Sequence, residues 1–149
     1  MVRARGGEHV LDSSAPDFAA RLAGLVRELN ATLFLDAIGG DMTRQLMDAA
    51  PYGSTLLLYS KMSEQDATID PFTALVKDLR LHGWFLPNWL KTKGLWQSIA
   101  LFNRAQKLLA TDLAPHVGAR VPMASAQAAL ETYMQSMTNH KVLIQMEEA

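Results

Sequence analysis

Short apolar runs alternate with helix-like segments along much of this chain, and this alternation constrains its fold most strongly. The runs lie at 32–35, 54–59 and 81–86, and turn-forming residues or polar loops separate them from the next segment. Continuous apolar runs of this kind are typical of strands that are buried on both faces of a parallel sheet. The alternation therefore predicts an α/β fold, in which ligands bind at the carboxyl ends of the strands.

Further elements are expected on either side of these runs. A β-like run begins near the N-terminus, and beyond Gly94 the pattern changes to a long amphipathic helix, which marks a subdomain boundary. In that helix we expect Leu95, Ile99, Phe102, Leu108 and Leu109 to point inward. The expected strands are 8–12, 32–35, 54–59, 81–86, 120–122 and 141–144, and the expected helices are 17–29, 41–49, 70–79, 95–112 and 125–137.

Composition excludes several classes of function. The chain has 149 residues, 49% of them hydrophobic, which is enough for the core of one globular domain. Its 14 basic and 15 acidic residues give a net charge of −1, so a nucleic-acid or anionic-membrane partner is not expected. The absence of cysteine excludes disulfides and thiolate zinc sites. The lack of cysteine also makes a bacterial-type cytoplasm the expected setting. We expect a soluble protein, because no apolar run approaches the length of a membrane span.

Two loops at predicted strand ends could approach a ligand. The loop Asp36-Ala-Ile-Gly-Gly40 lets the backbone come close to a ligand, but it also suits a tight strand-to-helix turn. Tyr59-Ser-Lys-Met62 offers a hydroxyl, an ammonium and a soft side chain, although an ordinary solvated loop would look the same. We expect the loops 36–40, 59–63 and 86–89 to share one edge of the sheet.

Aromatic residues and histidines give weaker signals. Trp84, Phe85 and Trp89 could form a flat apolar wall against a ring, or they could be core residues. The four histidines lie far apart in the sequence, so no metal site is expected. A phosphate-binding G-x-G-x-x-G pattern and a nucleophile elbow are both missing from the sequence.

Four motifs, read in order, resemble the C-terminal half of medium-chain dehydrogenases/reductases. They are Asp36–Gly40, Tyr59–Met62, Gly83-Trp-Phe-Leu-Pro-Asn-Trp89 and His140-Lys-Val-Leu-Ile144, and the resemblance runs from about Gly6 to Met146. The branch they resemble most is that of zinc-free NADPH-dependent quinone and 2-enoyl-thioester reductases. The resemblance implies a partial Rossmann-type nucleotide-binding domain at 1–111, and an α+β segment at 112–149 that joins the catalytic-domain side in the family.

The resemblance also implies which residues contact NADPH. In the family, a loop after one strand, an aromatic pair after the next strand and a lysine before the last strand contact this cofactor. Ser60 and Lys61 stand where the family usually has small glycines, and His140 replaces the usual glycine before the lysine. No catalytic residue and no metal ligand are implied. The implied cofactor-binding residues are Asp36, Gly39, Gly40, Tyr59, Ser60, Lys61, Met62, Trp84, Phe85, Leu86 and Lys141.

Two functions remain open from the sequence. The first is that of a fragment of an NAD(P)H-dependent oxidoreductase that reduces quinones or activated alkenes by hydride transfer. In the family, the catalytic domain and the glycine-rich phosphate turn would precede residue 1, and 8–11 and 32–35 would be strands three and four in the order 3-2-1-4-5-6. The second is that of an inactive domain that associates with itself or a partner. The resemblance also implies a homodimer contact at the edge strand 81–86, where members of the family commonly pair their subunits.

Overall fold

The chain forms two compact units. The computed structural model describes residues 2–3, 6–111, 113–114, 117–135 and 141–146. One unit comprises Val2–Lys93 and the other begins at Gly94. The division therefore coincides with the change of sequence pattern at Gly94. The domain boundary expected between 111 and 112 stays a prediction, and residue 112 lies outside the described residues.

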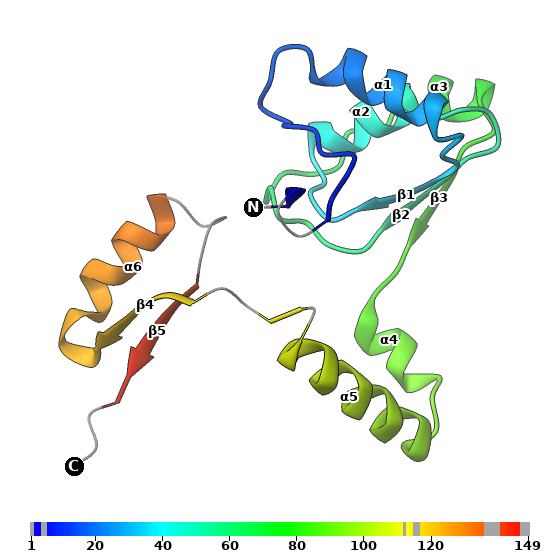
Figure 1. The fold of residues 1–149 in the computed structure, drawn as a ribbon. Coiled ribbons are helices and arrows are strands. Elements are labelled where there is room, and N and C mark those ends of the chain that lie inside the picture. The colour runs from blue at the N-terminus through cyan, green and yellow to red at the C-terminus, as the bar shows by residue number, and fades with distance from the viewer. Residues whose placement is uncertain (1, 4–5, 112, 115–116, 136–140, 147–149) are drawn as a thin grey trace. The chain divides into compact units, whose positions relative to one another are not determined.

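A three-stranded parallel sheet forms the centre of the first unit. Strands β1 (Leu33–Asp36), β2 (Thr55–Leu58) and β3 (Arg80–Gly83) are neighbours in this order, as Figure 1 shows. Phe34, Leu56 and Leu81 lie side by side in the register of the three strands. The structure thus confirms the parallel sheet predicted from the three apolar runs.

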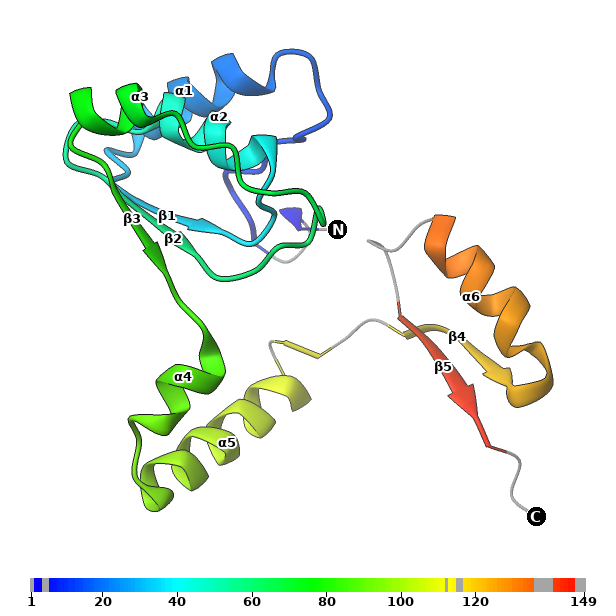
Figure 2. The same ribbon diagram turned by 180° about the vertical axis from the view of Figure 1, so that it is seen from behind.

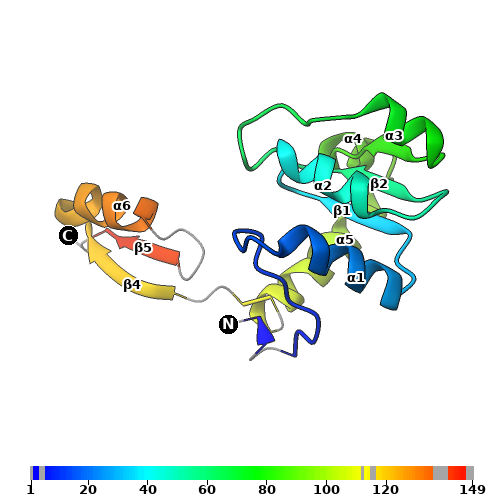
Figure 3. The same cartoon turned by 90° about the horizontal axis from the view of Figure 1, so that it is seen from above.

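Three helices cover one face of this sheet. Helices α1 (Phe18–Glu28), α2 (Asp41–Ala49) and α3 (Pro71–Val76) lie together on the same side of the strands, which Figures 1 and 3 show from two directions. The helices bury a single core between themselves and the sheet. Its buried members are Val26, Phe34, Met47, Ala50 and Leu56.

The opposite face of the sheet is exposed, which corrects the expectation that the strand at 32–35 is buried on both faces. Phe34 is 7% exposed, whereas Leu33 and Leu35 are each 61% exposed. Successive side chains of a strand point to opposite faces, and all three helices cover the same face. The alternating exposure along β1 follows directly from this one-sided helix layer.

The β-like run at 8–12 is not a strand, so this prediction was wrong. The segment instead turns at Asp12, whose Oδ1 accepts hydrogen bonds from the backbone N–H of Ser14 at 2.9 Å and its hydroxyl at 2.7 Å. A strand needs a neighbour for its backbone hydrogen bonds. Among the described strands β1 pairs with β2 alone, so the segment has no such neighbour.

The third strand is shorter than predicted, and a helix follows it. Strand β3 ends at Gly83, so Trp84 and Phe85 lie beyond the strand that was expected to contain them. Helix α4 (Leu86–Lys91) then occupies the position of the loop expected at 86–89. Pro87 stands in the first turn of α4, where its fixed φ and missing N–H favour helix initiation.

The second unit contains a helix and a small parallel sheet with its own helix. Helix α5 (Leu95–Ala110) is followed by strand β4 (Val117–Pro122), a 3₁₀ turn η2 (Met123–Ser125), helix α6 (Ala126–Gln135) and strand β5 (Lys141–Gln145). Strands β4 and β5 are parallel, and α6 lies along them, as Figure 2 shows. The predicted helices and strands of this region are confirmed in kind. Residues 136–137 of the predicted helix 125–137 lie outside the described residues.

Helix α5 buries none of its side chains, which corrects the expected inward-facing set. Leu95 is 71%, Phe102 is 57% and Leu109 is 54% exposed, and Ile99 and Leu108 are also exposed. An amphipathic pattern predicts the face that a helix can bury but does not supply the surface that covers it.

Over the part of the chain that the structure describes, no helix is both long and apolar enough to cross a membrane.

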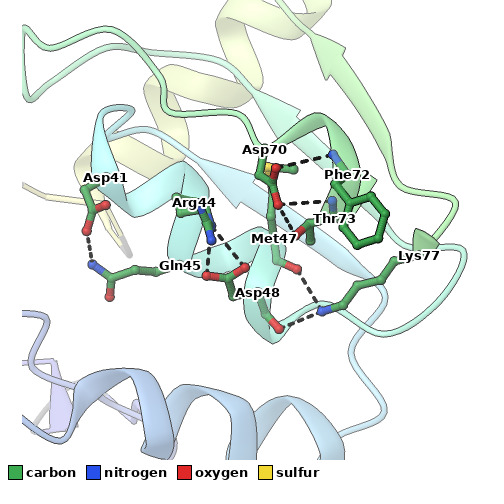
Figure 4. Close-up of polar contacts among 9 residues, drawn as sticks. All are labelled: Asp41, Arg44, Gln45, Met47, Asp48, Asp70, Phe72, Thr73 and Lys77. Carbon is green, nitrogen blue, oxygen red and sulfur yellow. Dashed lines mark hydrogen bonds and ion pairs between the residues drawn. The ribbon is translucent and has the colours of Figure 1, made fainter. Parts of the chain in front are cut away.

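Polar contacts fix α2 to α3, as the close-up in Figure 4 shows. Lys77 Nζ donates hydrogen bonds to the backbone oxygens of Met47, at 3.1 Å, and Asp48, at 2.7 Å. These carbonyls belong to the last turn of α2 and lack partners within the helix.

Asp70 caps α3 by accepting hydrogen bonds from the backbone N–H groups of Phe72 and Thr73 and from the Thr73 hydroxyl.

Replacement of Leu56 with alanine tests the one-sided core. Leu56 is 0% exposed, so its truncation leaves a cavity and should lower the free energy of unfolding by about 2–5 kcal/mol. The matched variant Leu35→Ala removes the same atoms from the exposed face and should lower it by less than about 1 kcal/mol. Urea unfolding followed by circular dichroism measures both. Equal losses in the two variants would contradict the exposed face.

Acid titration of Asp70→Asn tests the cap of α3. The hydrogen bond from the Thr73 hydroxyl, with those from the backbone, holds the pKa of the Asp70 carboxyl below its usual value. Its stabilising effect is therefore present above the unfolded pKa of about 3.9 and is lost as pH falls through the lower folded pKa. We expect the melting temperature of the unmodified chain to fall more steeply below about pH 4 than that of D70N.

A matched control for this titration is available at the start of α1. Asp17 precedes that helix but makes no side-chain cap hydrogen bond. Asp17→Asn should therefore follow the pH profile of the unmodified chain. Parallel profiles for D70N and the unmodified chain would show that Asp70 does not stabilise α3 through its charge.

Candidate functional site

A buried carboxylate organises the turn from β1 to α2. Asp36 is 1% exposed, and its Oδ1 accepts hydrogen bonds from the backbone N–H groups of Ile38 at 2.8 Å and Gly39 at 3.0 Å. Its Oδ2 accepts a hydrogen bond of 2.6 Å from the hydroxyl of Thr43 in α2. The Asp36 side chain is therefore turned into the protein, and a ligand at this edge would meet the backbone of the turn.

Gly39 and Gly40 are required by the shape of this turn. Their φ angles are +73° and +57°, in the region that residues with a side chain rarely adopt. A Cβ atom at Gly40 would lie 3.0 Å from Ser63 Oγ and 3.3 Å from the Gln65 side chain. Both glycines are buried. This geometry accounts for the glycine pair as a tight strand-to-helix turn, which was one of the two interpretations left open by the sequence.

The loop after β2 is hydrogen-bonded to this turn through the backbone. The N–H groups of Tyr59, Met62 and Ser63 donate to the oxygens of Asp36, Ala37 and Ile38 at 3.1, 3.0 and 3.0 Å. The structure therefore confirms that the segments 36–40 and 59–63 lie at the same edge of the sheet. The contributions of Thr43, Ser63 and Gln65 to this edge were not anticipated from the sequence.

Exposed side chains line the surface of the loop after β2. Tyr59 is 44% and Met62 is 70% exposed, and Ser60 is also exposed. Lys61 Nζ lies 2.6 Å from Asp66 Oδ1, and its hydrogen bond and charge hold the pKa of that carboxyl below its usual range. Because Lys61 is paired with a carboxylate, the loop presents a phenol and a thioether to solvent more freely than a cation.

The residues after β3 form an aromatic cluster. The Trp84 N–H donates to the Leu58 oxygen at 2.8 Å and so extends the β2–β3 pairing by one bond. The rings of Trp84 and Trp89 lie 6.0 Å apart at a tilt of 49°, and Lys93 Nζ lies 4.7 Å from the Trp89 ring centre. Both tryptophans are half-buried, whereas Phe85 is 62% and Leu86 is 47% exposed.

Lys141 belongs to the second unit, whereas the other predicted cofactor residues belong to the first. Its Nζ donates a hydrogen bond of 3.2 Å to the hydroxyl oxygen of Tyr133 and lies 5.8 Å from that ring centre. The structure thus joins the Asp36 turn to the Tyr59 loop and places the aromatic cluster after the neighbouring strand. The predicted contact of Lys141 with the cofactor stays a prediction.

Metal chemistry gains no support from the residues that the structure describes. They contain no group of three or more histidine, aspartate or glutamate side chains that could hold a metal ion. His116 and His140 lie outside these residues.

Known proteins resemble this chain in sequence and in fold over part of their length. No protein-family model matches the chain. Over 120 residues it is 28% identical to the mitochondrial enoyl-[acyl-carrier-protein] reductase of Mus musculus, a match that covers 76% of this chain and 31% of that protein. The human enzyme of the same name is 27% identical over 115 residues, with the same two shares.

Solved structures extend the likeness to the fold. A provisionally assigned NADPH:quinone reductase from Mesorhizobium loti superposes with a TM-score of 0.73 at 28% identity, covering 92% of this chain and 40% of that protein. The chain is similar in sequence and fold to part of the medium-chain dehydrogenase/reductase superfamily. Within this superfamily it is similar to the quinone oxidoreductases and enoyl reductases.

A solved structure of lower sequence identity shows a likeness of fold alone. CurA from Vibrio vulnificus, solved in complex with NADPH, has a TM-score of 0.63 at 18% identity and matches 97% of this chain and 44% of its own. The predicted α/β fold with parallel sheets is confirmed as part of the superfamily fold. The chain spans about a third of the length of the curated superfamily relatives that it matches.

Removal of the Asp36 carboxylate tests its role in the turn. Asp36→Ala leaves the N–H groups of Ile38 and Gly39 and the Thr43 hydroxyl without their acceptor. The hydrogen bonds of Gly39 and Thr43 are buried, and each buried group left unpaired costs about 1–3 kcal/mol. Asp36→Asn keeps one oxygen for the backbone, and its amide can donate to the Thr43 hydroxyl. Urea unfolding should show a clearly larger loss for D36A than for D36N. Equal and small losses would contradict the proposed organising role.

Proposed function

We propose that the chain forms the nicotinamide side of an NADPH site in a reductase of quinones or activated alkenes. The observation that carries this proposal is the joined edge of β1 and β2, where Tyr59 and Met62 are exposed beside the glycine turn at the strands' carboxyl ends. Open α/β sheets bind their ligands at this edge. The similarity to enoyl and quinone reductases supports the same assignment.

The exposed side chains of this edge fit a flat ring better than a phosphate. Tyr59, Met62, Phe85 and Leu86 offer apolar and aromatic surface, whereas Lys61 is paired with Asp66. The buried Asp36 and the two glycines then act by holding the turn. When bound, NADPH supplies the hydride. The residues of the chain bind and orient the ring and keep water from one side of it.

We propose catalysis only for a full-length protein of the kind that the curated relatives represent. The chain spans about a third of the curated relatives, and its described residues include no acid that could be assigned to protonate a substrate. For the chain by itself we propose cofactor binding with negligible turnover. We place it in the cytoplasm, a setting that its lack of cysteine fits.

Self-association is the alternative function, and the exposed apolar surface of the first unit favours it. Leu33 and Leu35 form an uncovered strip on β1, and β1 and β3 are both edges of the three-stranded sheet. Unpaired strand edges are templates for pairing with another chain. In this alternative the chain is an inactive module, and the edge at β3 is the proposed homodimer contact.

Thermal melts with and without millimolar NADPH test the proposed site. A ligand that binds only the folded state stabilises it by about 2.7 kcal/mol at 100 times its Kd, so we expect a clear rise in melting temperature. Tyr59→Ala should reduce the rise. Tyr52→Ala is the matched control, because Tyr52 is 74% exposed before the start of β2, away from the strand's carboxyl end.

The same samples separate the two functions when they are sized by light scattering. No rise in melting temperature with NADPH or NADH, together with a stable oligomer, would favour the self-associating module. An equal rise for all three proteins would show that the cofactor binds away from Tyr59.

A further inference from the structure

We propose that the hollow between α6 and β5 binds a medium-chain aliphatic carboxylate. This inference concerns the second unit alone and uses a lysine, Lys141, that the family resemblance also assigns to the cofactor. It is drawn from the juxtaposition of an apolar hollow with a lysine–tyrosine pair at its rim. The hollow has a volume of about 240 Å³.

The walls of the hollow are aliphatic. Helix α6 contributes Ala126, Ala129 and Leu130, and β5 contributes Val142 and Ile144. The three helical residues share one face of α6, because positions three and four apart in a helix lie on the same side. Leu130 is 57% and Ile144 is 48% exposed, so an apolar ligand would remove their surface from water.

Two hydrogen-bond donors meet at the rim. Lys141 Nζ donates to the hydroxyl oxygen of Tyr133 at 3.2 Å, which leaves the hydroxyl proton and two ammonium protons available. A carboxylate can accept from both groups at once, and hydrogen bonds to a charged acceptor are stronger than neutral ones. The pair therefore suits one negatively charged head group.

The charge of the lining selects an anion. Lys141 is the one charged residue among the residues that line this hollow. The acid nearest in sequence on α6 is Glu131, and it accepts a hydrogen bond from Gln127, a neighbour outside the lining. An apolar body with a single anionic head matches this distribution.

Two other hollows lack the combination of an apolar wall with a cation and no carboxylate in the lining. A hollow of about 340 Å³ between α6 and β4 also meets Ala129 and Tyr133, but no charged side chain lines it. Another of about 340 Å³, in the first unit, mixes the cations Arg3 and Arg21 with the carboxylates of Glu8 and Glu28. Of these three hollows, only the one at β5 combines an apolar wall with a cation and has no carboxylate among its lining residues.

Titration calorimetry on the full chain tests this inference with hexanoate, octanoate and decanoate below their micelle concentrations. We expect affinity to increase roughly fourfold for each methylene that enters the hollow. Octanol, which lacks the charge, and inorganic phosphate, which lacks the chain, should both bind much more weakly than octanoate. In ¹⁵N-labelled protein, octanoate should shift the amide signals of α6 and β5.

Variants separate the contribution of the ligand's carboxylate head group from that of its alkyl chain. Lys141→Met keeps the aliphatic stem and should weaken octanoate at least tenfold, whereas Lys107→Met removes an exposed lysine of α5 and should change nothing. Leu130→Ala should reduce the gain per methylene. Circular dichroism confirms that each variant is folded.

Several results would overturn the inference. They are octanol binding as tightly as octanoate, octanoate binding that K141M leaves unchanged, phosphate binding as tightly as octanoate, and no binding up to the solubility limit. Competition between NADPH and octanoate, with K141M weakening both, would assign the hollow to the cofactor. The NADPH melts of the Tyr59 variant report on the first unit, so failure here leaves the proposed function standing.

Discussion

The Asp36 carboxylate is the interaction on which the ligand-facing edge of the first unit depends. It ends β1, accepts hydrogen bonds from the next backbone turn and holds Thr43 of α2 from inside the protein. With this turn closed, the backbone oxygens of 36–38 are presented to the loop after β2. A buried polar group is favourable only when it is fully hydrogen-bonded, and no buried side-chain polar atom in the described residues lacks a partner.

Because the helices all lie on one side of the sheet, the first unit has one buried sheet face and one exposed sheet face. The core of α1, α2 and the sheet is continuous on one face, while the leucines of β1 remain exposed on the other. Parallel sheets usually have both faces covered. The exposed leucines are therefore the physical basis of the self-association alternative.

Local patterns predicted most of the elements. The helix predicted at 41–49 matches α2, and the three apolar runs became neighbouring parallel strands. The errors arose where formation depends on a partner: the run at 8–12 has no neighbouring strand, and α5 has an apolar face that stays exposed. The helix after Phe85 was missed although Pro87 is a recognised signal for a first helical turn.

The candidate site was predictable to a similar degree. Strand ends located the two loops, because carboxyl ends of parallel strands meet at one edge. The partners Thr43 and Ser63 depend on how the chain crosses itself in three dimensions, so spacing alone could not identify them. The assignment of Tyr59–Met62, Trp84–Leu86 and Lys141 to the cofactor stays a prediction.

The order of the strands in the larger sheet has a consequence for biosynthesis. Neighbours in the sheet are also neighbours in the chain, from β1 through β2 to β3. Each strand that leaves the ribosome therefore finds its pairing partner already made, and no strand must wait for a distant one to be inserted between two others. Such a sheet can grow by addition at one side during translation, which keeps the separation of paired segments short.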